Sequence, residues 1–482
     1  MMWSVNVFAC LAALIIISLS HWVYRWRNPK CNGKLFPGSM GLPFIGETIQ
    51  LILPSQSIDI PAFVKKRMAK YGKIFRTNLV GKPVIMSCDA EFNHYVLNQE
   101  GKSVELWYMD SFAKIFHRDG GSMSVGIIHK YLRSIVLSHF GNETLREKLV
   151  IKLEAMVKQN LHSWSTQSSV DVKAEATKML FDFTMGQLFG YDPTKSSENL
   201  SKRFTNFMQG LFSIPFNIPG TSFHKCMKNQ KVVLDMIRST LKERRVSPEK
   251  RRGDFLDDIM DDMKTHSFLT EDFIVHFIFA VTMASFEANS SALVSAIKFL
   301  TENPLVVKEL KEEHEAILES RENADSGITW TEYKSMTFTS NVINETLRLA
   351  NVSPGMLRRA TKDVEYNGYT IPAGWTIFIV PSAVNLNPDT YEDPLKFNPW
   401  RWKELKSNVT LKNYIIFGGG GRPCTGAEFT KVSMAIFLHI LVTKYSWKFI
   451  KGGTIVRNPI LGFRDGLHIK LSEKSVKEMP SH

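Results

Sequence analysis

Cysteine is scarce in this sequence, and its scarcity limits the kinds of site that the chain can build. The 482 residues include five cysteines, and no two of them stand close together. Disulfide frameworks and structural zinc sites need closely spaced cysteines, so the pattern argues against both. It also indicates that the folded part of the chain faces a reducing compartment. The five are Cys10, Cys31, Cys88, Cys226 and Cys424.

Signatures of nucleic-acid binding are also missing. Lysine and arginine number 60 against 47 aspartates and glutamates, a formal net charge of +13. Neither a long lysine/arginine block nor an RNA-binding signature accompanies this excess, so we expect no nucleic acid as a partner. An anionic membrane surface or an acidic protein partner suits the charge better.

An apolar run from Val5 to Val23 predicts a membrane anchor. As a helix it would span roughly 28 Å, about the thickness of one hydrocarbon core. Basic residues follow the run and none precedes it, which places the rest of the chain in the cytosol. A cleaved signal peptide is the alternative, but its basic flank would come first. We therefore expect an anchor at residues 1–28 and a hinge rich in proline and glycine at 29–46.

Several patterns beyond the hinge predict secondary structure. Gly81 predicts a strand hairpin over 74–86, and Asn367-Gly368 predicts another over 364–371. Thr270 begins a long, buried helix that Pro304 stops. The other expectations are a helix over 338–350, loop-like segments over 89–116 and 204–223, and a charged, solvated connection over 242–262.

A cysteine in a glycine-rich loop is the most specific feature of the chain. Residues 417–426 read Phe-Gly-Gly-Gly-Gly-Arg-Pro-Cys-Thr-Gly, and an apolar helical pattern follows. Glycines let backbone N–H groups approach the Cys424 sulfur, and a helix N-terminus adds positive charge, so both favour a thiolate suited to haem iron. A small buried side chain in a tight turn is the plain alternative. A phosphate-binding loop fails, because no Gly-Lys-Ser/Thr follows.

This loop resembles the Phe-x-x-Gly-x-Arg-x-Cys-x-Gly signature of the cytochrome P-450 haem-thiolate monooxygenases. Its fixed positions are all filled, by Phe417, Gly420, Arg422, Cys424 and Gly426. The resemblance covers essentially the whole chain and implies one catalytic domain at residues 47–482, although length alone would suggest two or three domains. It implies the mostly helical, prism-shaped α+β fold of this family with small sheets. It also implies haem b (iron protoporphyrin IX) as the cofactor, with Cys424 as the axial ligand of the iron.

Three arginines stand at the family positions that bind the haem propionates. They are Arg422, Arg358 and Arg133, with Arg359 as the alternative to Arg358 for the inward-facing position. Propionates are carboxylates, which arginine binds in a bidentate manner. The family usually has a tryptophan four residues before the arginine at position 133, where the two bind a haem propionate. In this chain His129 stands at the tryptophan position.

Two further motifs imply the Glu-Arg-Arg triad that holds the cysteine loop in the family. Glu345 and Arg348 lie three residues apart, on one helix face. Arg401 completes the triad within Phe397-Asn-Pro-Trp-Arg, where Trp400 replaces the usual glutamate. Without these motifs, the first pair would read as a surface ion pair worth little.

The stretch 284–290 is similar, imperfectly, to the oxygen-binding stretch of the family's long helix. Glu287 stands at the acidic position, but the usual threonine is Ala288. An acid and a hydroxyl at these places relay protons in the family. Ser291 lies four residues after Glu287 and on nearly the same face as Ala288, so Ser291, ordered water or a substrate hydroxyl is expected to replace the threonine.

The resemblance implies insertion of oxygen from dioxygen into an unactivated C–H bond. Electrons would come from NADPH through a membrane-bound flavoprotein, NADPH-cytochrome P-450 reductase. Lys130, Arg133 and Lys431 are candidate docking charges for it, although each also reads as a solvated side chain. We expect a monomer with a single span in the endoplasmic reticulum membrane and a cytosolic catalytic domain.

The hinge and the motifs around His129, Phe397 and Gly426 resemble plant microsomal members that oxidise sterols, triterpenoids and related isoprenoid hormones. We expect hydroxylation of a tetracyclic sterol or triterpenoid, with repeated oxidation up to side-chain cleavage as a variant. A terpenoid-hormone hydroxylase, a lipid enzyme that uses peroxide or no external electrons, and a non-catalytic anchored protein are the alternatives. The lipophilic substrate is expected to contact Phe112, Phe212, Met283, Ala284 and Met356.

Overall fold

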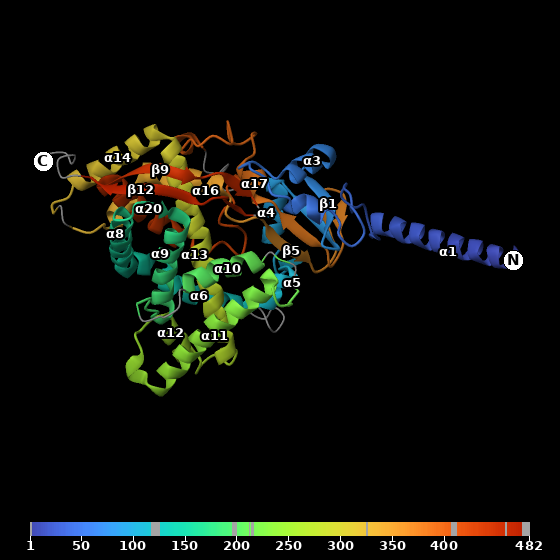
Figure 1. The fold of residues 1–482 in the computed structure, drawn as a ribbon, viewed down its shortest axis with the longest axis horizontal. Helices are drawn as coiled ribbons and strands as arrows, with labels where there is room; N and C mark the ends of the chain where they lie inside the picture. The colour runs from blue at the N-terminus through green and yellow to red at the C-terminus, as the bar shows by residue number, and fades with distance from the viewer. Residues whose placement is uncertain are drawn as a thin grey trace.

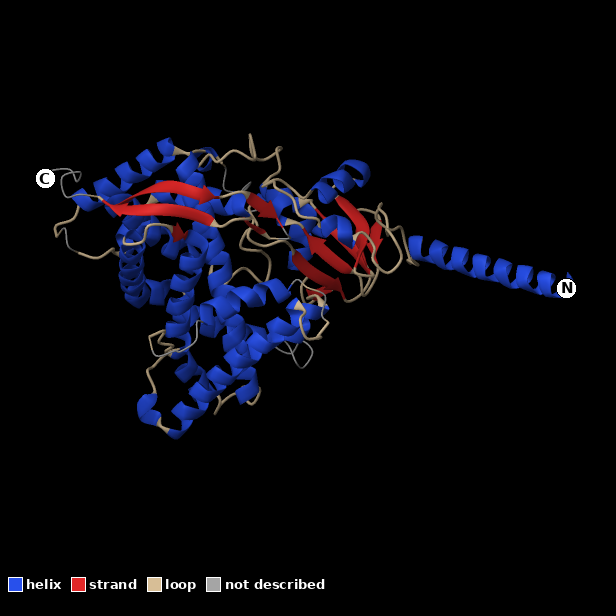
Figure 2. Cartoon of the chain, viewed as in Figure 1, coloured by secondary structure: helices blue, strands red, loops and turns tan. Residues whose placement is uncertain are grey.

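Helices form most of the protein, and its strands gather in two places (Figure 2). One sheet lies beside the base of the N-terminal helix, and the β9–β12 ladder lies on the far side of the helical part (Figure 1). The structure is a computed structural model that describes residues 2–116, 126–194, 200–211, 213, 216–323, 326–405, 412–457 and 460–474.

The N-terminal helix α1 (Met2–Arg27) extends away from the rest of the protein, with the N-terminus at its tip (Figure 1). Its large apolar side chains from Leu11 to Leu19 are 52% to 64% exposed. Among the described residues, one helix has the length and hydropathy of a membrane span, and it is α13 (Glu271–Glu302). Because 67% of its most apolar window is buried inside the protein, α13 is a core helix.

The largest sheet has the strand order β1-β2-β8-β5-β3, in which β2 and β8 are parallel and the other neighbours are antiparallel. Val80 and Gly81 make the turn between β1 and β2 with φ values of 52° and 77°. The strands of this sheet are β1 (Ile74–Leu79), β2 (Lys82–Ser87), β3 (Val104–Leu106), β5 (Met356–Ala360) and β8 (Thr376–Ile379).

Three smaller sheets are antiparallel. Their orders are β4-β12-β9, β10-β11 and β6-β7, and Asn367 and Gly368 turn the last of them with positive φ. The strands are β4 (Val170–Asp171), β6 (Val364–Tyr366), β7 (Tyr369–Ile371), β9 (Tyr445–Gly452), β10 (Ile455–Arg457), β11 (Leu461–Phe463) and β12 (Leu467–Glu473).

The core is built around α13 and α20 (Ala427–Lys444), whose apolar faces are buried on nearly all sides. Thr270 caps α13 by accepting a hydrogen bond from the Phe273 N–H, and Pro304 begins the next helix. α13 packs against α9 (Val172–Phe189), α11 (Ser222–Val246), α14 (Pro304–Glu319) and α16 (Thr337–Ala350). α20 packs against α8 (Val150–Ser165), α14 and α16.

Shorter helices surround this core. They are α2 (Thr48–Ile52), α3 (Ala62–Tyr71), α4 (Ala90–Asn98), α5 (Asp110–Phe116), α6 (Gly126–Phe140), α7 (Asn142–Thr144), α10 (Leu200–Leu211), α12 (Phe255–Asp262), α15 (Trp330–Ser335), α17 (Pro381–Asn385) and α18 (Arg401–Glu404). A π-helical turn at Leu145–Leu149 precedes α8, and a 3-10 turn lies at Pro248–Lys250.

The structure confirms both hairpins, the long buried helix and the helix predicted over 338–350. The loop-like prediction for 89–116 is wrong, because this segment holds α4, β3 and α5. The Asp89 side chain caps α4 by accepting a hydrogen bond from the Phe92 N–H at 2.8 Å. Phe92 and Val96 are fully buried, which stabilises the helix in its tertiary context.

Two other segments also contain helices. In 204–223, α10 continues to Leu211 and α11 starts at Ser222, so part of the loop-like segment is helical. The connection over 242–262 includes the end of α11 and all of α12, so the prediction of a solvated connection is wrong. Arg244 is 3% exposed and pairs with Asp254 and Asp257, which neutralise it inside the protein.

Candidate active site

The loop of Cys424 is folded tightly by its glycines. Gly418 and Gly420 have φ values of 74° and 62°, in the left-handed region that glycine adopts without strain. A Cβ atom on Gly420 would lie 2.1 Å from the Leu97 carbonyl oxygen, so that approach excludes any side chain. The Cys424 N–H donates to the Phe417 carbonyl at 2.8 Å, and Gly426 is the N-cap of α20.

The Cys424 thiol is exposed to open space although protein atoms surround its loop. Burial raises the pKa of Cys424, whereas the Gly426 N–H and the Arg133 guanidinium oppose that shift. Arg133 also donates to the Pro423 carbonyl at 2.6 Å. A metal ion bound to this sulfur would displace its proton, since metal binding releases ligand protons.

Two arginines converge on one carboxylate beside this loop. Arg358 Nε lies 2.9 Å from Glu100 Oε2, and Arg422 pairs with the same carboxylate. Neither Arg358 Nε nor Glu100 Oε2 has a well-directed hydrogen bond, although both are buried. Burial lowers the pKa of Arg358, and Glu100 opposes this. Arg359 points to the other side and pairs with Glu105, so Arg358 is the inward arginine.

His129 belongs to the same electrostatic cluster. Burial lowers the pKa of His129, the charges of Arg422 and Arg133 lower it further, and Glu100 raises it. The structure thus brings His129, Arg133, Arg358 and Arg422 together around the cysteine loop. Glu100 was missed by sequence reasoning, because nothing in its local sequence relates it to a partner 322 residues away.

Glu345, Arg348 and Arg401 form a buried ion cluster. Arg348 Nη2 donates to Glu345 Oε1 at 2.8 Å, and Arg401 Nε donates to the same oxygen at 3.0 Å. The exposed fractions of the three side chains are 0%, 0% and 8%. The Trp402 indole and the Asn398 N–H also donate to the Glu345 carboxylate, each at 3.0 Å.

Both arginines of this cluster hold the chain that leads to the cysteine loop. Arg348 donates to the carbonyls of Asn385 and Pro394, and Arg401 donates to that of Glu392. Trp400, at the place of the usual glutamate, donates its indole N–H to Glu309 at 2.6 Å.

One face of α13 borders open space. Ala284 and Ala288 are exposed in the middle of this buried helix, whereas Thr282 and Phe286 are fully buried. Glu287, predicted to be the acid, forms an ion pair with Lys173 of α9 at 2.9 Å. Lys173 also donates to Ser290 and Ser291, and sequence reasoning gave no sign of it.

Of the residues predicted to contact substrate, Phe112 stacks on Tyr108 with ring centroids 5.6 Å apart. Met356 lies beside the cysteine loop, with its sulfur 3.8 Å from where a Cβ of Gly418 would be. Met283 is 5% exposed, so Ala284 rather than Met283 faces the open space. Phe212 lies outside the described residues.

The comparisons with known proteins agree with this geometry. The cytochrome P-450 family model matches residues 36–469. The chain belongs to the cytochrome P-450 family. It is 47% identical to a beta-amyrin 16-alpha-hydroxylase of Maesa lanceolata and 48% identical to a cucurbitadienol 11-hydroxylase of Siraitia grosvenorii. Each match covers 98% of this chain and 100% of the relative.

A solved structure supports the same assignment. The retinoic acid-bound cyanobacterial CYP120A1 superposes with a TM-score of 0.80 at 26% identity, covering 92% of this chain and 100% of that one. This protein therefore has the cytochrome P-450 fold and is an oxidoreductase of the monooxygenase type, with a reductase as its electron-donating partner and a lipophilic substrate.

The residues of this P-450 fit haem, the cofactor that family and fold imply. The Cys424 thiol is exposed, and the small side chains of Ala284 and Ala288 are exposed on α13. Arg358 keeps an unsatisfied Nε that a propionate oxygen would complete. Cys424 would hold the haem through its thiolate, and the bound haem would supply the O–O cleavage that oxygen insertion requires.

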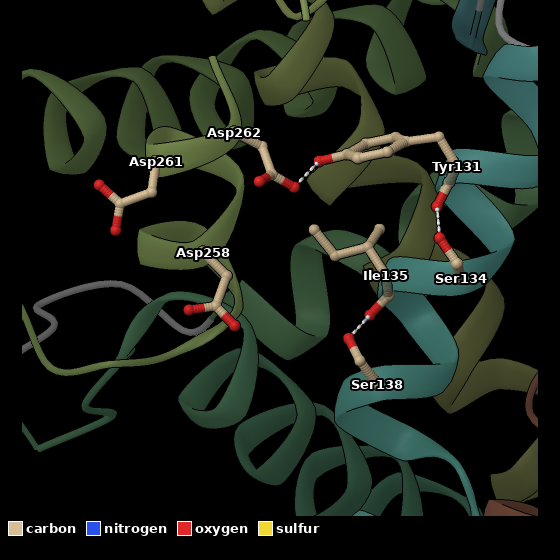
Figure 3. A pocket seen from close by; sticks show the side chains of 7 residues that line it. All are labelled: Tyr131, Ser134, Ile135, Ser138, Asp258, Asp261 and Asp262. Atoms are coloured by element: carbon tan, nitrogen blue, oxygen red, sulfur yellow. Dashed lines mark hydrogen bonds between the residues drawn. The ribbon is translucent and has the colours of Figure 1, made fainter. Parts of the chain in front are cut away.

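A cavity of about 390 Å³ opens between α6 and α12 (Figure 3). It is lined by Asp258, Asp261 and Asp262, and Tyr131 donates its hydroxyl to Asp262 at 2.7 Å. No residue of the cysteine-loop cluster lines it. The cavity is therefore separate from the candidate active site.

Proposed function

We propose that this P-450 hydroxylates a triterpenoid or sterol. The observation that carries the proposal is identity of 47% and 48%, over essentially full length, to two enzymes named as hydroxylases of beta-amyrin and cucurbitadienol. Repeated oxidation of one substrate, up to side-chain cleavage, is included as a variant. The reaction uses dioxygen and electrons from NADPH delivered by the reductase.

The lining of the site supports a bulky, apolar substrate. Ala284 and Ala288 leave space along α13, and Phe112 and Met356 present aromatic and thioether surfaces. Apolar pockets of this kind bind lipophilic ligands, while a few polar groups fix their orientation.

We assign the residues around Cys424 to binding and orientation of the haem. Cys424 is its axial ligand, and Arg358, Arg422, Arg133 and His129 bind its propionates. Glu345, Arg348 and Arg401 hold the cysteine loop without touching substrate. Their buried hydrogen bonds to carbonyls before the loop support that structural role.

Glu287, Ala288 and Ser291 are assigned to the proton-handling face of α13. Ala288 cannot hold a proton, so the hydroxyl of Ser291, together with water or a substrate hydroxyl, does so. The exposure of Ala288 and the partial exposure of Ser291 support this assignment, because both side chains then reach the same open space.

We further propose that residues 1–28 anchor the protein in the endoplasmic reticulum membrane, with residues 29–46 as a hinge and a monomeric, cytosolic catalytic domain at 47–482. The exposed apolar surface of α1 supports the anchor. Exposed apolar residues at the end of the hinge and after it support further lipid contact, since patches of this kind mark interaction surfaces. These are Leu42, Phe44, Ile45, Ile49, Ile52, Leu53 and Val80.

The test is turnover by membranes that contain this protein and the reductase. A panel of triterpenes and sterols is incubated with and without NADPH, and products are identified by mass spectrometry. We expect NADPH-dependent gain of one oxygen atom on a triterpene or sterol. Turnover that needs peroxide in place of NADPH, or no product from the whole panel, would contradict the proposal.

A further inference from the structure

The ammonium group of Lys173, on α9, lies among three polar side chains of α13. Its Nζ donates to Glu287 Oε1 at 2.9 Å, to Ser290 Oγ at 2.8 Å and to Ser291 Oγ at 2.9 Å. An ammonium has three N–H donors and no acceptor, so these three contacts use all of its hydrogens. Side-chain exposure is 29% for Lys173 and 20% for Glu287.

The two serines of this cluster differ in what their hydrogens do. Ser290 Oγ accepts from Lys173 and from Thr177, and donates its one hydrogen to the Glu287 carbonyl at 3.1 Å. Ser291 Oγ accepts from Lys173, and within the described part of the chain its hydrogen has no acceptor. Ser290 is therefore saturated, whereas Ser291 keeps a hydrogen that it can donate elsewhere.

The helical geometry directs that hydrogen toward the open face. At about 100° per residue, Ser291 lies about 20° from Ala284 around the axis and about 60° from Ala288. Ser290 lies about 160° from Ala288, on the side turned to α9. Ser290 is fully buried, whereas Ser291 is partly exposed.

We propose that Lys173 is a positioning residue for proton supply at this face: it holds the Glu287 carboxylate in an ion pair and occupies the acceptor side of Ser291, so that the Ser291 hydroxyl points its hydrogen into the open space beside Ala288. This inference rests on the proposed function, in which haem and substrate occupy that open space. It explains how a chain that has Ala288 in place of threonine can still direct a hydroxyl, that of Ser291, to the open face of α13.

The charges around Lys173 agree with this role. Burial lowers the pKa of Lys173, and the carboxylates of Glu287 and Asp171 oppose that shift. Asp171 is fixed by accepting the backbone N–H groups of Lys173 and Ala174 as the cap of α9. Glu287 is the carboxylate in direct contact, so removal of the ammonium leaves it partly buried without a cation.

The experiment compares haem-loaded Lys173→Met, Lys173→Arg and Ser291→Ala with the native protein. Lys178→Met is the matched control, because Lys178 is on the same helix, 52% exposed, and paired with Asp182. Haem content, NADPH consumed, peroxide released and product formed are measured in one reaction. In the absence of substrate, infrared difference spectra at neutral pH measure the carboxylate stretching band of Glu287, with the corresponding Glu287→Gln variants as the references.

We expect Lys173→Met to keep its haem, to release several-fold more peroxide per NADPH, and to shift the carboxylate stretching band of Glu287. Lys173→Arg should restore the native ratio, and Lys178→Met should not alter it. Ser291→Ala should raise peroxide release per NADPH as much as Lys173→Met does. The variant that combines both changes should release no more peroxide than either one alone. Native coupling in Ser291→Ala or in a haem-loaded Lys173→Met would overturn the proposal.

The infrared measurement separates this inference from the proposed function. It needs no substrate, so it reports on the Lys173–Glu287 pair even if the substrate panel yields no product. An unshifted carboxylate band of Glu287 in Lys173→Met would overturn the ion-pairing role of Lys173 whatever the substrate is.

Discussion

At residue 288, the absence of one hydroxyl group determines what the open face of α13 offers to its ligands. Ala288 is exposed in the middle of a buried helix, and the nearest hydroxyl on that face is Ser291. A hydroxyl one helical turn from residue 288 holds its hydrogen in a less fixed position than a hydroxyl at residue 288 would. The weak point of proton supply is therefore a single side chain.

Ala288→Thr should raise the product formed per NADPH, because it adds a hydroxyl at the open face. Ala288→Val is the matched control, since valine has nearly the same shape as threonine but no hydroxyl. Product, peroxide and NADPH are measured together for all three proteins. Equal coupling in the threonine and valine variants would show that the hydroxyl at 288 is irrelevant.

At the scale of single residues, the sequence fails to predict contacts in which the two side chains come from distant segments of the chain. The motif identified Arg358 and Arg422, but their shared partner Glu100 precedes them by hundreds of residues. Lys173 is 114 residues from Glu287, and the pattern around it reads as an ordinary helix start. Such contacts depend on how α9 packs on α13, which no local pattern encodes.

Among the elements, the segment between α16 and α20 depends on one glutamate. Glu345 accepts from Arg348, Arg401, Trp402 and Asn398, and all of these contacts are buried or nearly so. Two cations without their carboxylate would lie in a medium that solvates charge poorly. The cysteine loop should therefore lose its ordered structure when this ion cluster is broken.

Glu345→Ala is expected to destabilise the protein by about 3–5 kcal/mol and to yield haem-poor protein. Haem content per protein and the thermal midpoint are the measurements. Glu309→Ala is a control, because Glu309 is partly exposed and contacts Trp400 and Lys403 outside the cluster. A Glu345→Ala protein with full haem content and a native midpoint would contradict the structural role.

Two buried histidines join α14 to α20. His439 Nδ1 lies 3.0 Å from His314 Nδ1, and the two side chains are 4% and 0% exposed. Burial lowers the pKa of His439 from 6.5 to about 3, with Arg321, Lys158 and Lys444 adding to the shift. Burial and His439 also hold the pKa of His314 well below its usual range.

This pair should make the protein less stable as the pH falls below about 6.5, because the unfolded histidines take up protons that the folded ones refuse. The stabilisation is present above the unfolded pKa of 6.5 and is lost as the pH falls toward 3. The thermal midpoint, followed between about pH 7 and 4, should decline less steeply in His314→Leu/His439→Leu. His94→Gln, at an exposed site, should keep the native slope. Equal slopes in all three proteins would contradict the assignment.

Helices and hairpins that have characteristic turn or cap residues could be predicted from the sequence. Short helices with weaker local signals could not. The Asn367-Gly368 turn and the Thr270 cap specify their own geometry. The helices α4, α5 and α12 are short, and their stability comes from burial of residues such as Phe92 and Phe255. In α12, charged residues concealed a buried cluster, because a sequence does not reveal which charges neutralise one another.

For the whole molecule, the motifs of the cysteine loop and the triad were sufficient to predict the family. These motifs do not indicate how the protein is attached to the membrane. α1 projects from the domain with its apolar side chains exposed (Figure 1). The folded core begins within the hinge, because Phe36 and Met40 are buried, and the family model also begins at residue 36.

Deletion of residues 2–27 should release the protein from membranes in large part, while its haem content stays native. The apolar residues after the hinge should retain a fraction of it on lipid. Membrane sedimentation and haem content are measured for the full and shortened chains. Loss of haem on truncation would show that α1 belongs to the folded core, contrary to the anchor.

The central claim is that Cys424 is the thiolate ligand of a haem in a cytochrome P-450. It is tested most directly by the absorption spectrum of the reduced protein under carbon monoxide. The native protein should give the red-shifted band of a thiolate-ligated haem, and Cys424→Ser should lose that band because serine supplies no thiolate. A red-shifted band that survives in Cys424→Ser, or that is missing from haem-loaded native protein, would contradict the account.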